Sequence, residues 1–155
     1  MNNNSLVSIV VATYKRDLSL RKALESLINQ TYKNIEIIVV DDNSNEEWNK
    51  KVKEIIDDFI NKSNIIYIKN EKNKGSAQTR NIGIEKANGE YITFLDDDDI
   101  YLPNKILNQL NKMKEYDADF SVTDLELLSE NGKIIEKRTR GYINKIPTTF
   151  YSLLH

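Results

Sequence analysis

The chain alternates short β-branched apolar runs with longer segments whose apolar residues recur at helical spacing. The apolar runs occupy residues 7–12, 35–40, 65–68 and 91–95. Continuous runs of this kind are typical of strands buried on both faces of a sheet. Repeated strand–helix units predict an α/β fold with a largely parallel sheet and right-handed crossovers.

The segments between these runs carry helix signals. The first has one apolar face, formed by Leu20, Ala23, Leu24, Leu27 and Ile28. Ser44 and Glu47 have the spacing of a capping box before the second helix. Gly89 stands where a left-handed residue would end the third helix, and Pro103 suits the first turn of the fourth.

The C-terminal part of the chain departs from this alternation. Residues 119–123 predict a further strand, and Asn131-Gly132 between two apolar runs predicts an antiparallel hairpin. Residues 133–145 carry five basic side chains, interpreted as a solvated strand face, with an anionic acceptor or membrane surface as the alternative. The residues after Pro147 predict a helix that starts and then stops at the chain end. We therefore expect residues 1–155 to be a single domain that is a fragment of a longer protein.

Composition excludes several function classes. The formal net charge is −2, so the chain lacks the basic field of nucleic-acid binders. It has no cysteine, and its one histidine, His155, is terminal, which leaves no Cys–His or Ser–His–Asp arrangement. The longest purely apolar run, residues 9–12, is far shorter than the roughly 20 residues of a membrane-spanning helix. With no secretory signal at the N-terminus, the expected location is the cytoplasm.

Polar clusters follow three of the predicted strands. These clusters are Thr13-Tyr14-Lys15, Asp41-Asp42 and the four aspartates 96–99. The carboxyl ends of parallel strands share one edge of a sheet, and ligands bind there near the point where strand order reverses. The sequence thus predicts that the three clusters meet at one site.

The four aspartates are the sharpest of these features. In extended backbone Asp96 and Asp98 point the same way, so both can reach one cation directly or through water. Carboxylate oxygens suit magnesium or manganese, which often link a protein carboxylate to substrate phosphates. The alternative is a solvated acidic turn before a helix.

Three further residues have two interpretations each. Asp41 could accept hydrogen bonds from a nucleotide base or ribose, or simply form a turn. The ring of Tyr14 could stack on a nucleobase, or it could pack against other side chains of the protein. The guanidinium of Arg80 could bind a diphosphate with two hydrogen bonds, or lie on a helix surface.

An ordered set of motifs resembles a known family. VSIVVATY, SLINQTY, IEIIVVDDNS, RNIGI and GEYITFLDDDD follow one another along the chain. This set resembles the family-two inverting glycosyltransferases of the GT-A fold, over about residues 5–115. The resemblance implies a three-layer sandwich with a mostly parallel sheet and an antiparallel hairpin.

The resemblance also implies roles for individual residues. Ala12, Thr13, Tyr14 and Asp41 contact the nucleotide base, and Arg80 lies toward the diphosphate. The DxD motif falls on residues 96–98, where Asp96 belongs to the donor site, Asp97 lies on the ribose, and Asp98, with Asp96, ligates Mn²⁺ or Mg²⁺. Lys15 replaces the asparagine common after the tyrosine.

The implied reaction moves a sugar from a nucleoside-diphosphate sugar, expected to be UDP-linked, to a hydroxyl acceptor with inversion. The expected acceptor is a carbohydrate or a lipid-linked group in polysaccharide or glycolipid synthesis. Contact with the inner face of the membrane and formation of a homodimer are two further possibilities. The resemblance also implies that the domain formed by residues 1–155 is truncated before its acceptor-binding part. The catalytic base is expected beyond His155, and Asp124 is not assigned that role. Two alternatives stay open: a non-catalytic nucleotide-sugar-binding module, and a sugar nucleotidyltransferase, which should carry a glycine-rich loop after the first strand.

Overall fold

A computed structural model of the chain describes residues 4–129 and 131–138. Its elements are, in order, β1 (Val7–Thr13), α1 (Leu18–Ile28), β2 (Ile35–Asp41), α2 (Glu46–Asp57), β3 (Ile65–Lys69), α3 (Ser76–Lys86), β4 (Tyr91–Asp96), α4 (Lys105–Tyr116), β5 (Leu125–Leu128) and β6 (Ile134–Arg138). The chain divides into two compact units, Met1–Asn111 and Lys112–His155, which we describe separately. The four predicted strand–helix units are confirmed.

The first unit is built on a parallel sheet with the strand order β3-β2-β1-β4. β1 is central and pairs with β2 on one side and with β4 on the other, so that Ala12 lies opposite both Val40 and Asp96. The chain adds β2 and β3 on one side of β1 and then returns to place β4 on the other. Strand order therefore reverses between β1 and β4, which is where ligands bind in open sheets of this kind.

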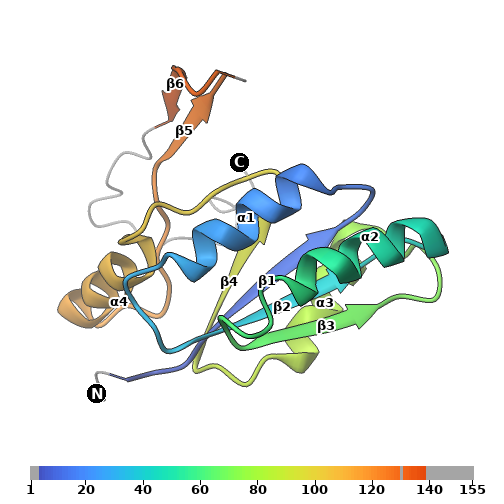
Figure 1. Cartoon of the computed structure of the whole chain (residues 1–155). Helices are drawn as coiled ribbons and strands as arrows, with labels where there is room; N and C mark the ends of the chain where they lie inside the picture. The colour runs from blue at the N-terminus through green and yellow to red at the C-terminus, as the bar shows by residue number, and fades with distance from the viewer. Residues whose placement is uncertain (1–3, 130, 139–155) are drawn as a thin grey trace. The chain divides into compact units, whose positions relative to one another are not determined.

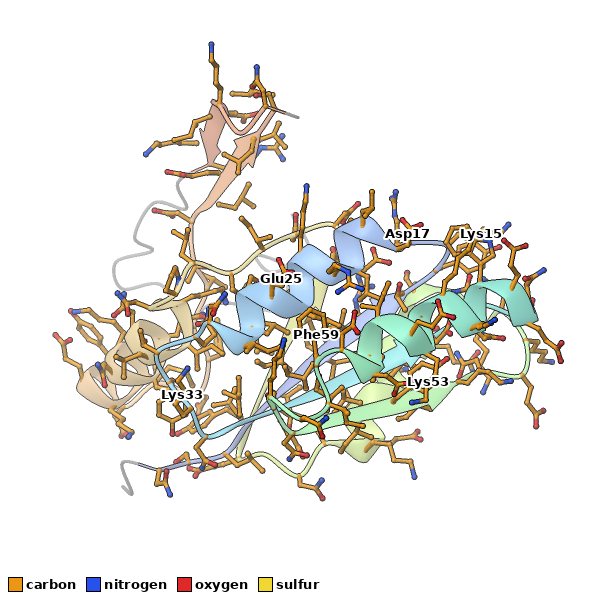
Figure 2. All side chains as sticks on the ribbon, viewed as in Figure 1. Lys15, Asp17, Glu25, Lys33, Lys53 and Phe59 are labelled. Carbon is orange, nitrogen blue, oxygen red and sulfur yellow. The ribbon has the colours of Figure 1, made fainter. Side chains whose placement is uncertain are left out.

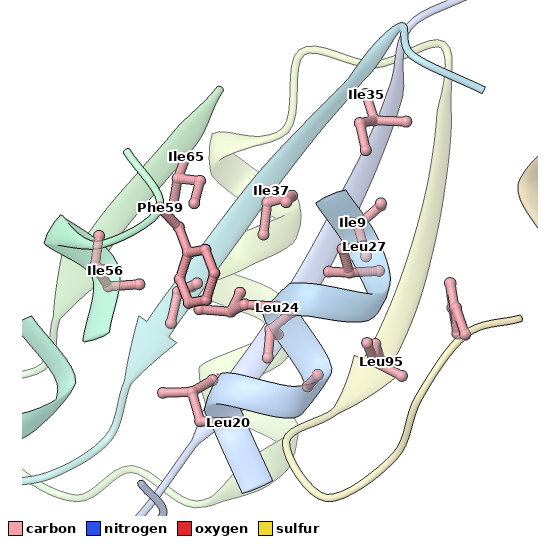
Figure 3. Close-up of a cluster of buried hydrophobic side chains, with 14 of the residues drawn as sticks. Ile9, Leu20, Leu24, Leu27, Ile35, Ile37, Ile56, Phe59, Ile65 and Leu95 are labelled. Atoms are coloured by element: carbon pink, nitrogen blue, oxygen red, sulfur yellow. The ribbon is translucent and has the colours of Figure 1, made fainter. Parts of the chain in front are cut away.

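Helices cover both faces of this sheet and make the unit three-layered (Figure 1). On one face, α1 and α2 pack on the odd-numbered residues of β1 and β2 (Figure 3). Ile106 and Leu110 from the start of α4 belong to the same buried cluster. On the other face, α3 packs on Val10, Ile38 and Val40. This arrangement follows from right-handed crossovers, because the reversal of direction after β3 puts α3 on the opposite face. The predicted α/β sandwich is confirmed.

Two glycines allow close approach to β1. A Cβ atom on Gly83 of α3 would overlap Val10 Cγ1, so this glycine lets the helix lie close against the strand. A Cβ atom on Gly89 would lie 2.6 Å from the backbone nitrogen of Ser8. Gly89 does not have the left-handed backbone predicted for it, because α3 already ends at Lys86, so that prediction was wrong.

The predicted helix starts need two corrections. Asn45, rather than Ser44, is the N-cap of α2, and its Oδ1 accepts hydrogen bonds from the backbone nitrogens of Glu47 and Trp48 at 2.9 and 3.3 Å. Both side chains are good N-caps, and sequence spacing favoured the wrong neighbour. Pro103 lies before α4 rather than in its first turn. Its carbonyl oxygen accepts hydrogen bonds from the backbone nitrogen and the hydroxyl group of Thr31.

The second unit contains the end of α4 and an antiparallel hairpin. β5 and β6 pair antiparallel, and Gly132 in the turn has a φ of 77°, so the predicted Asn131-Gly132 hairpin is confirmed. Residues 119–123 form no strand, which corrects that prediction. The basic residues Arg140 and Lys145 and the helix predicted after Pro147 lie outside the described residues.

Candidate functional site

A cavity of about 320 Å³ lies at the carboxyl ends of β1 and β4 in the first unit. Its lining comes from the ends of β1, β2 and β4 and from the start of α3: Ala12, Thr13, Tyr14, Arg16, Asp42, Asn73, Gly75, Ser76, Thr79, Arg80, Asp96, Asp97 and Asp98. Seven of the eight predicted site residues are in this lining; Asp41 is not. The structure thus places the predicted clusters together where strand order reverses.

Asp97 ties the end of β4 to the end of β1. Its Oδ2 accepts a hydrogen bond from Thr13 Oγ1 at 2.8 Å and another from the backbone nitrogen of Tyr14 at 3.3 Å. The side chain is only 13% exposed, and burial raises its pKa although these hydrogen bonds oppose the shift. Burial and the charges of Asp96 and Asp98 likewise raise the pKa of Asp99.

Asp96 and Asp98 are the exposed carboxylates of the acidic run that line the cavity. Their side chains are 54% and 53% exposed. Each is paired with an arginine: Asp96 Oδ1 with Arg80 Nη2, and Asp98 Oδ2 with Arg16 Nη2 at 3.2 Å. Arg80 reaches the site from α3, whereas Arg16 comes from the segment after β1. Sequence reasoning did not select Arg16.

Asp41 is fully buried and does not line the cavity, but its hydrogen bonds fix the residues that follow β2. One carboxylate oxygen accepts from the backbone and side-chain nitrogens of Asn43 at 2.9 and 2.7 Å, and the other accepts from Asn49 Nδ2 and Tyr67 OH at 2.9 and 2.7 Å. Burial, together with the Asp41 carboxylate, raises the pKa of Tyr67. Asn43 Oδ1 in turn accepts a hydrogen bond from the backbone nitrogen of Lys15 at 2.9 Å, and Lys15 has a φ of 53°.

The neighbouring Asp42 is the β2-end aspartate that lines the cavity. Its carboxylate accepts hydrogen bonds from the backbone nitrogens of Lys74 and Gly75, both at 2.9 Å, and from Asn70 Nδ2 at 2.8 Å. Burial alone would raise its pKa, but these bonds outweigh burial and lower it. The sequence placed Asp42 in the cluster after the second strand but gave a role only to Asp41. Adjacent residues at a strand end point in opposite directions, which was the available signal for Asp42.

Gly75 and Ser76 place the N-terminus of α3 at the cavity. Gly75 is the N-cap of this helix, and its φ of 80° is one that glycine adopts without steric cost. The N-terminus of a helix carries partial positive charge and favours anionic groups. The cavity therefore combines a helix N-terminus and two arginines with a set of carboxylates.

The carboxylate set fits a hard divalent cation shared with a ligand. Within residues 4–129 and 131–138, no group of three or more acidic, histidine or cysteine side chains is arranged to hold a metal by itself. Mg²⁺ and Mn²⁺ are commonly held by one or two carboxylates together with substrate phosphates. The accessible Asp96 and Asp98 could supply that protein share.

The fold and the site together define a GT-A-type glycosyltransferase domain. Residues 8–154 match the family described as Glycosyl transferase family 2, and the chain belongs to that family. The predicted family is thereby confirmed.

Similar proteins agree with this assignment. UDP-Glc:alpha-D-GlcNAc-diphosphoundecaprenol beta-1,3-glucosyltransferase WfaP of Escherichia coli is 42% identical over 123 residues, covering 77% of this chain and 45% of that protein. The crystal structure of S. aureus TarS with UDP-GlcNAc superposes with a TM-score of 0.67 at 24% identity, covering 81% of this chain and 41% of that one. The structure of GalNAc-T7 with UDP, GalNAc and Mn²⁺ gives a TM-score of 0.53 at 28% identity, covering 63% of this chain and 19% of that one.

The chain spans between about a fifth and a half of the length of the curated relatives it matches. Among the residues that the structure describes, none of the helices has the length and apolar character needed to cross a membrane.

Proposed function

We propose that this chain is the donor-binding part of a glycosyltransferase and that its cavity binds a nucleoside-diphosphate sugar, with UDP as the nucleotide. The observation that carries the proposal is the cavity between the ends of β1 and β4. Tyr14, Arg80 and residues 96–98 of the acidic run lie together in its lining. WfaP is named for a UDP-glucose donor, and the TarS and GalNAc-T7 structures contain UDP-GlcNAc or UDP, which supports a uridine nucleotide.

The cavity residues divide by chemistry. The half-exposed ring of Tyr14, with Ala12 and Thr13, offers a surface for the nucleobase. Asp97 is fixed against β1 and is proposed to face the ribose, while Arg80 and the N-terminus of α3 suit the diphosphate. Asp41, which the resemblance implies at the base, is proposed to act through Asn43 and Lys15, and Asp42 to face the nucleoside.

A divalent cation, Mn²⁺ or Mg²⁺, is proposed to be held by Asp98 and Asp96 together with the diphosphate. When bound, such an ion offsets the charge that develops on a leaving nucleoside diphosphate. The chain's own residues hold the donor: Thr13 keeps Asp97 in place, and Asp42 keeps Gly75 at the helix N-terminus. The Mn²⁺ in the GalNAc-T7 structure supports a metal of this kind.

Transfer is proposed to occur with inversion onto a hydroxyl acceptor, which is a carbohydrate or a lipid-linked group. The acceptor named for WfaP is linked to diphosphoundecaprenol, which supports a lipid-linked acceptor. We propose that the catalytic base lies beyond His155. A donor-binding module without turnover is the competing function; sugar transfer by a longer protein that includes this chain would exclude it.

Calorimetric titration of the chain with UDP, with and without Mn²⁺, tests the proposal. We expect binding in the presence of Mn²⁺ and a loss of roughly tenfold or more in affinity for Asp98→Asn, because that variant removes one anionic ligand at nearly constant shape. Asp58→Asn is the matched control, since Asp58 is also a half-exposed aspartate paired with an arginine but does not line the cavity. If UDP failed to bind in the presence of Mn²⁺, the donor-site proposal would be excluded. If Asp98→Asn bound UDP with Mn²⁺ as tightly as wild type does, the metal role of Asp98 would be excluded.

A further inference from the structure

Arg16 pairs with Asp98, one of the two exposed carboxylates of the acidic run that line the cavity. We propose that Arg16 is an exchangeable counter-ion: it pairs with Asp98 when no cation is bound there, and it contacts the donor diphosphate when a divalent cation binds Asp98. The inference rests on the proposed function. It adds a donor-binding residue and an order of events at the site.

The geometry gives Arg16 access to both positions. Its Nη2 lies 3.2 Å from Asp98 Oδ2, and its Nε lies 3.9 Å from Asp97 Oδ1. The side chain is 51% exposed and also lines the cavity. A half-exposed ion pair contributes little to stability because water screens it, so a ligand of higher charge can displace it.

The backbone before Arg16 directs this side chain to the site. Lys15 has a left-handed backbone, and its nitrogen is held by Asn43 Oδ1. Asn43 is itself held by the buried carboxylate of Asp41. Arg16 therefore leaves a fixed turn, and only its side chain has to move between two anionic partners.

The charge of the lining explains why an exchange is needed. Four carboxylates and two guanidinium groups line the cavity, which leaves a formal charge of −2 with every carboxylate ionised. A diphosphate alone would meet net repulsion there. If Asp98 held a divalent cation, the cation would compensate this charge, and the guanidinium of Arg16 could turn from Asp98 to the diphosphate while its Nε stays close to Asp97. Guanidinium groups bind phosphate oxygens through paired hydrogen bonds.

Arg16→Met tests the exchange, because methionine removes the charge and keeps an unbranched chain. Without nucleotide, we expect its affinity for Mn²⁺, followed by electron paramagnetic resonance of the free ion, to rise about threefold, because a competing surface pair is gone. At saturating Mn²⁺, we expect its calorimetric affinity for UDP to fall roughly tenfold, because a charge-assisted contact to the diphosphate is lost. Opposite signs in the two titrations are the signature of the exchange.

Arg21→Met is the matched control. Arg21 also pairs with a half-exposed aspartate, Asp58 at 2.7 Å, but neither residue lines the cavity, so both affinities should stay at the wild-type values. If wild type binds UDP with Mn²⁺ but Arg16→Met leaves either affinity unchanged, or moves both in the same direction, the exchange is refuted and the donor site stands. If wild type itself binds no UDP with Mn²⁺, the proposed function fails and the exchange fails with it.

Discussion

Thr13 Oγ1 donates a hydrogen bond of 2.8 Å to Asp97 Oδ2 and so links the end of β1 to the residue that follows β4. The two residues are 84 positions apart in the chain. Their strands are neighbours on either side of the point where strand order reverses. The bond therefore fixes the acidic run against the cavity wall that also carries Tyr14.

Thr13→Val should destabilise the chain by about 1–2 kcal/mol, because it leaves the largely buried Asp97 carboxylate without its hydroxyl donor. Urea unfolding measures the change in the free energy of unfolding. Thr13→Ser keeps the hydroxyl and should lose less than the valine variant. A valine variant as stable as wild type, or one that loses no more stability than the serine variant, would contradict the role of the hydrogen bond.

Gly83→Ala should destabilise the chain by about 1–3 kcal/mol, because the added methyl group overlaps Val10 and forces α3 away from β1. The same displacement moves Thr79 and Arg80, so affinity for UDP with Mn²⁺ should fall as well. Gln78→Ala, on the exposed side of α3, is the control and should change neither quantity. A Gly83→Ala variant as stable as wild type would contradict the close packing of α3.

These packing relationships show what the sequence could and could not predict. β1 and β2 were predictable because their apolar runs are buried on both faces. The meeting of the polar clusters was predictable because parallel strands end at one edge. The choice between Ser44 and Asn45 as N-cap was not, since both side chains cap helices equally well and lie side by side.

Sequence reasoning assigned no individual role to Asp42 and did not select Arg16, for different physical reasons. Asp41 and Asp42 are the same residue type at one strand end. Only the backbone conformation at that end decides which of the two side chains faces the cavity. Arg16 depends on the left-handed turn at Lys15, which is set by a hydrogen bond to Asn43 that is distant in sequence. Periodicity carries no information about such a contact. Residues 119–123 have strand-like composition but pair with no strand in the described part of the chain.

Glu36 should make stability depend on pH. Burial opposes ionisation, but hydrogen bonds from Ser8 Oγ at 2.5 Å and from the Asn88 backbone at 2.6 Å lower its pKa. A lowered folded pKa gives stability that is present above the unfolded value of about 4.3 and is lost as pH falls through the folded pKa.

Urea unfolding between pH 7 and pH values below about 4 checks this expectation. Wild type should lose stability on acidification, and Glu36→Gln should lose about 1 kcal/mol less over the same interval, because one stabilised carboxylate is absent. Asp42 also has a lowered pKa, so some acid sensitivity should persist in the variant. Identical pH profiles for wild type and Glu36→Gln would refute the role of Glu36.

Lys15→Asn should stabilise the chain by about 0.5–1 kcal/mol, because asparagine tolerates the left-handed backbone better than lysine does. Thermal unfolding measures the gain. Lys15→Ala removes the lysine side chain without relieving the backbone strain, so it should bring no comparable gain. A gain of the same size in the alanine variant would attribute the effect to the loss of the lysine charge.

The donor cavity is tested most directly by nuclear magnetic resonance of the ¹⁵N-labelled chain titrated with UDP-GlcNAc and Mg²⁺. We predict that the largest amide shifts fall on Tyr14, Gly75, Arg80 and residues 96–98, which line one cavity although they are far apart in the chain. Shifts that are absent, or that concentrate on the β5–β6 hairpin or at the amino ends of the parallel strands, would contradict the account.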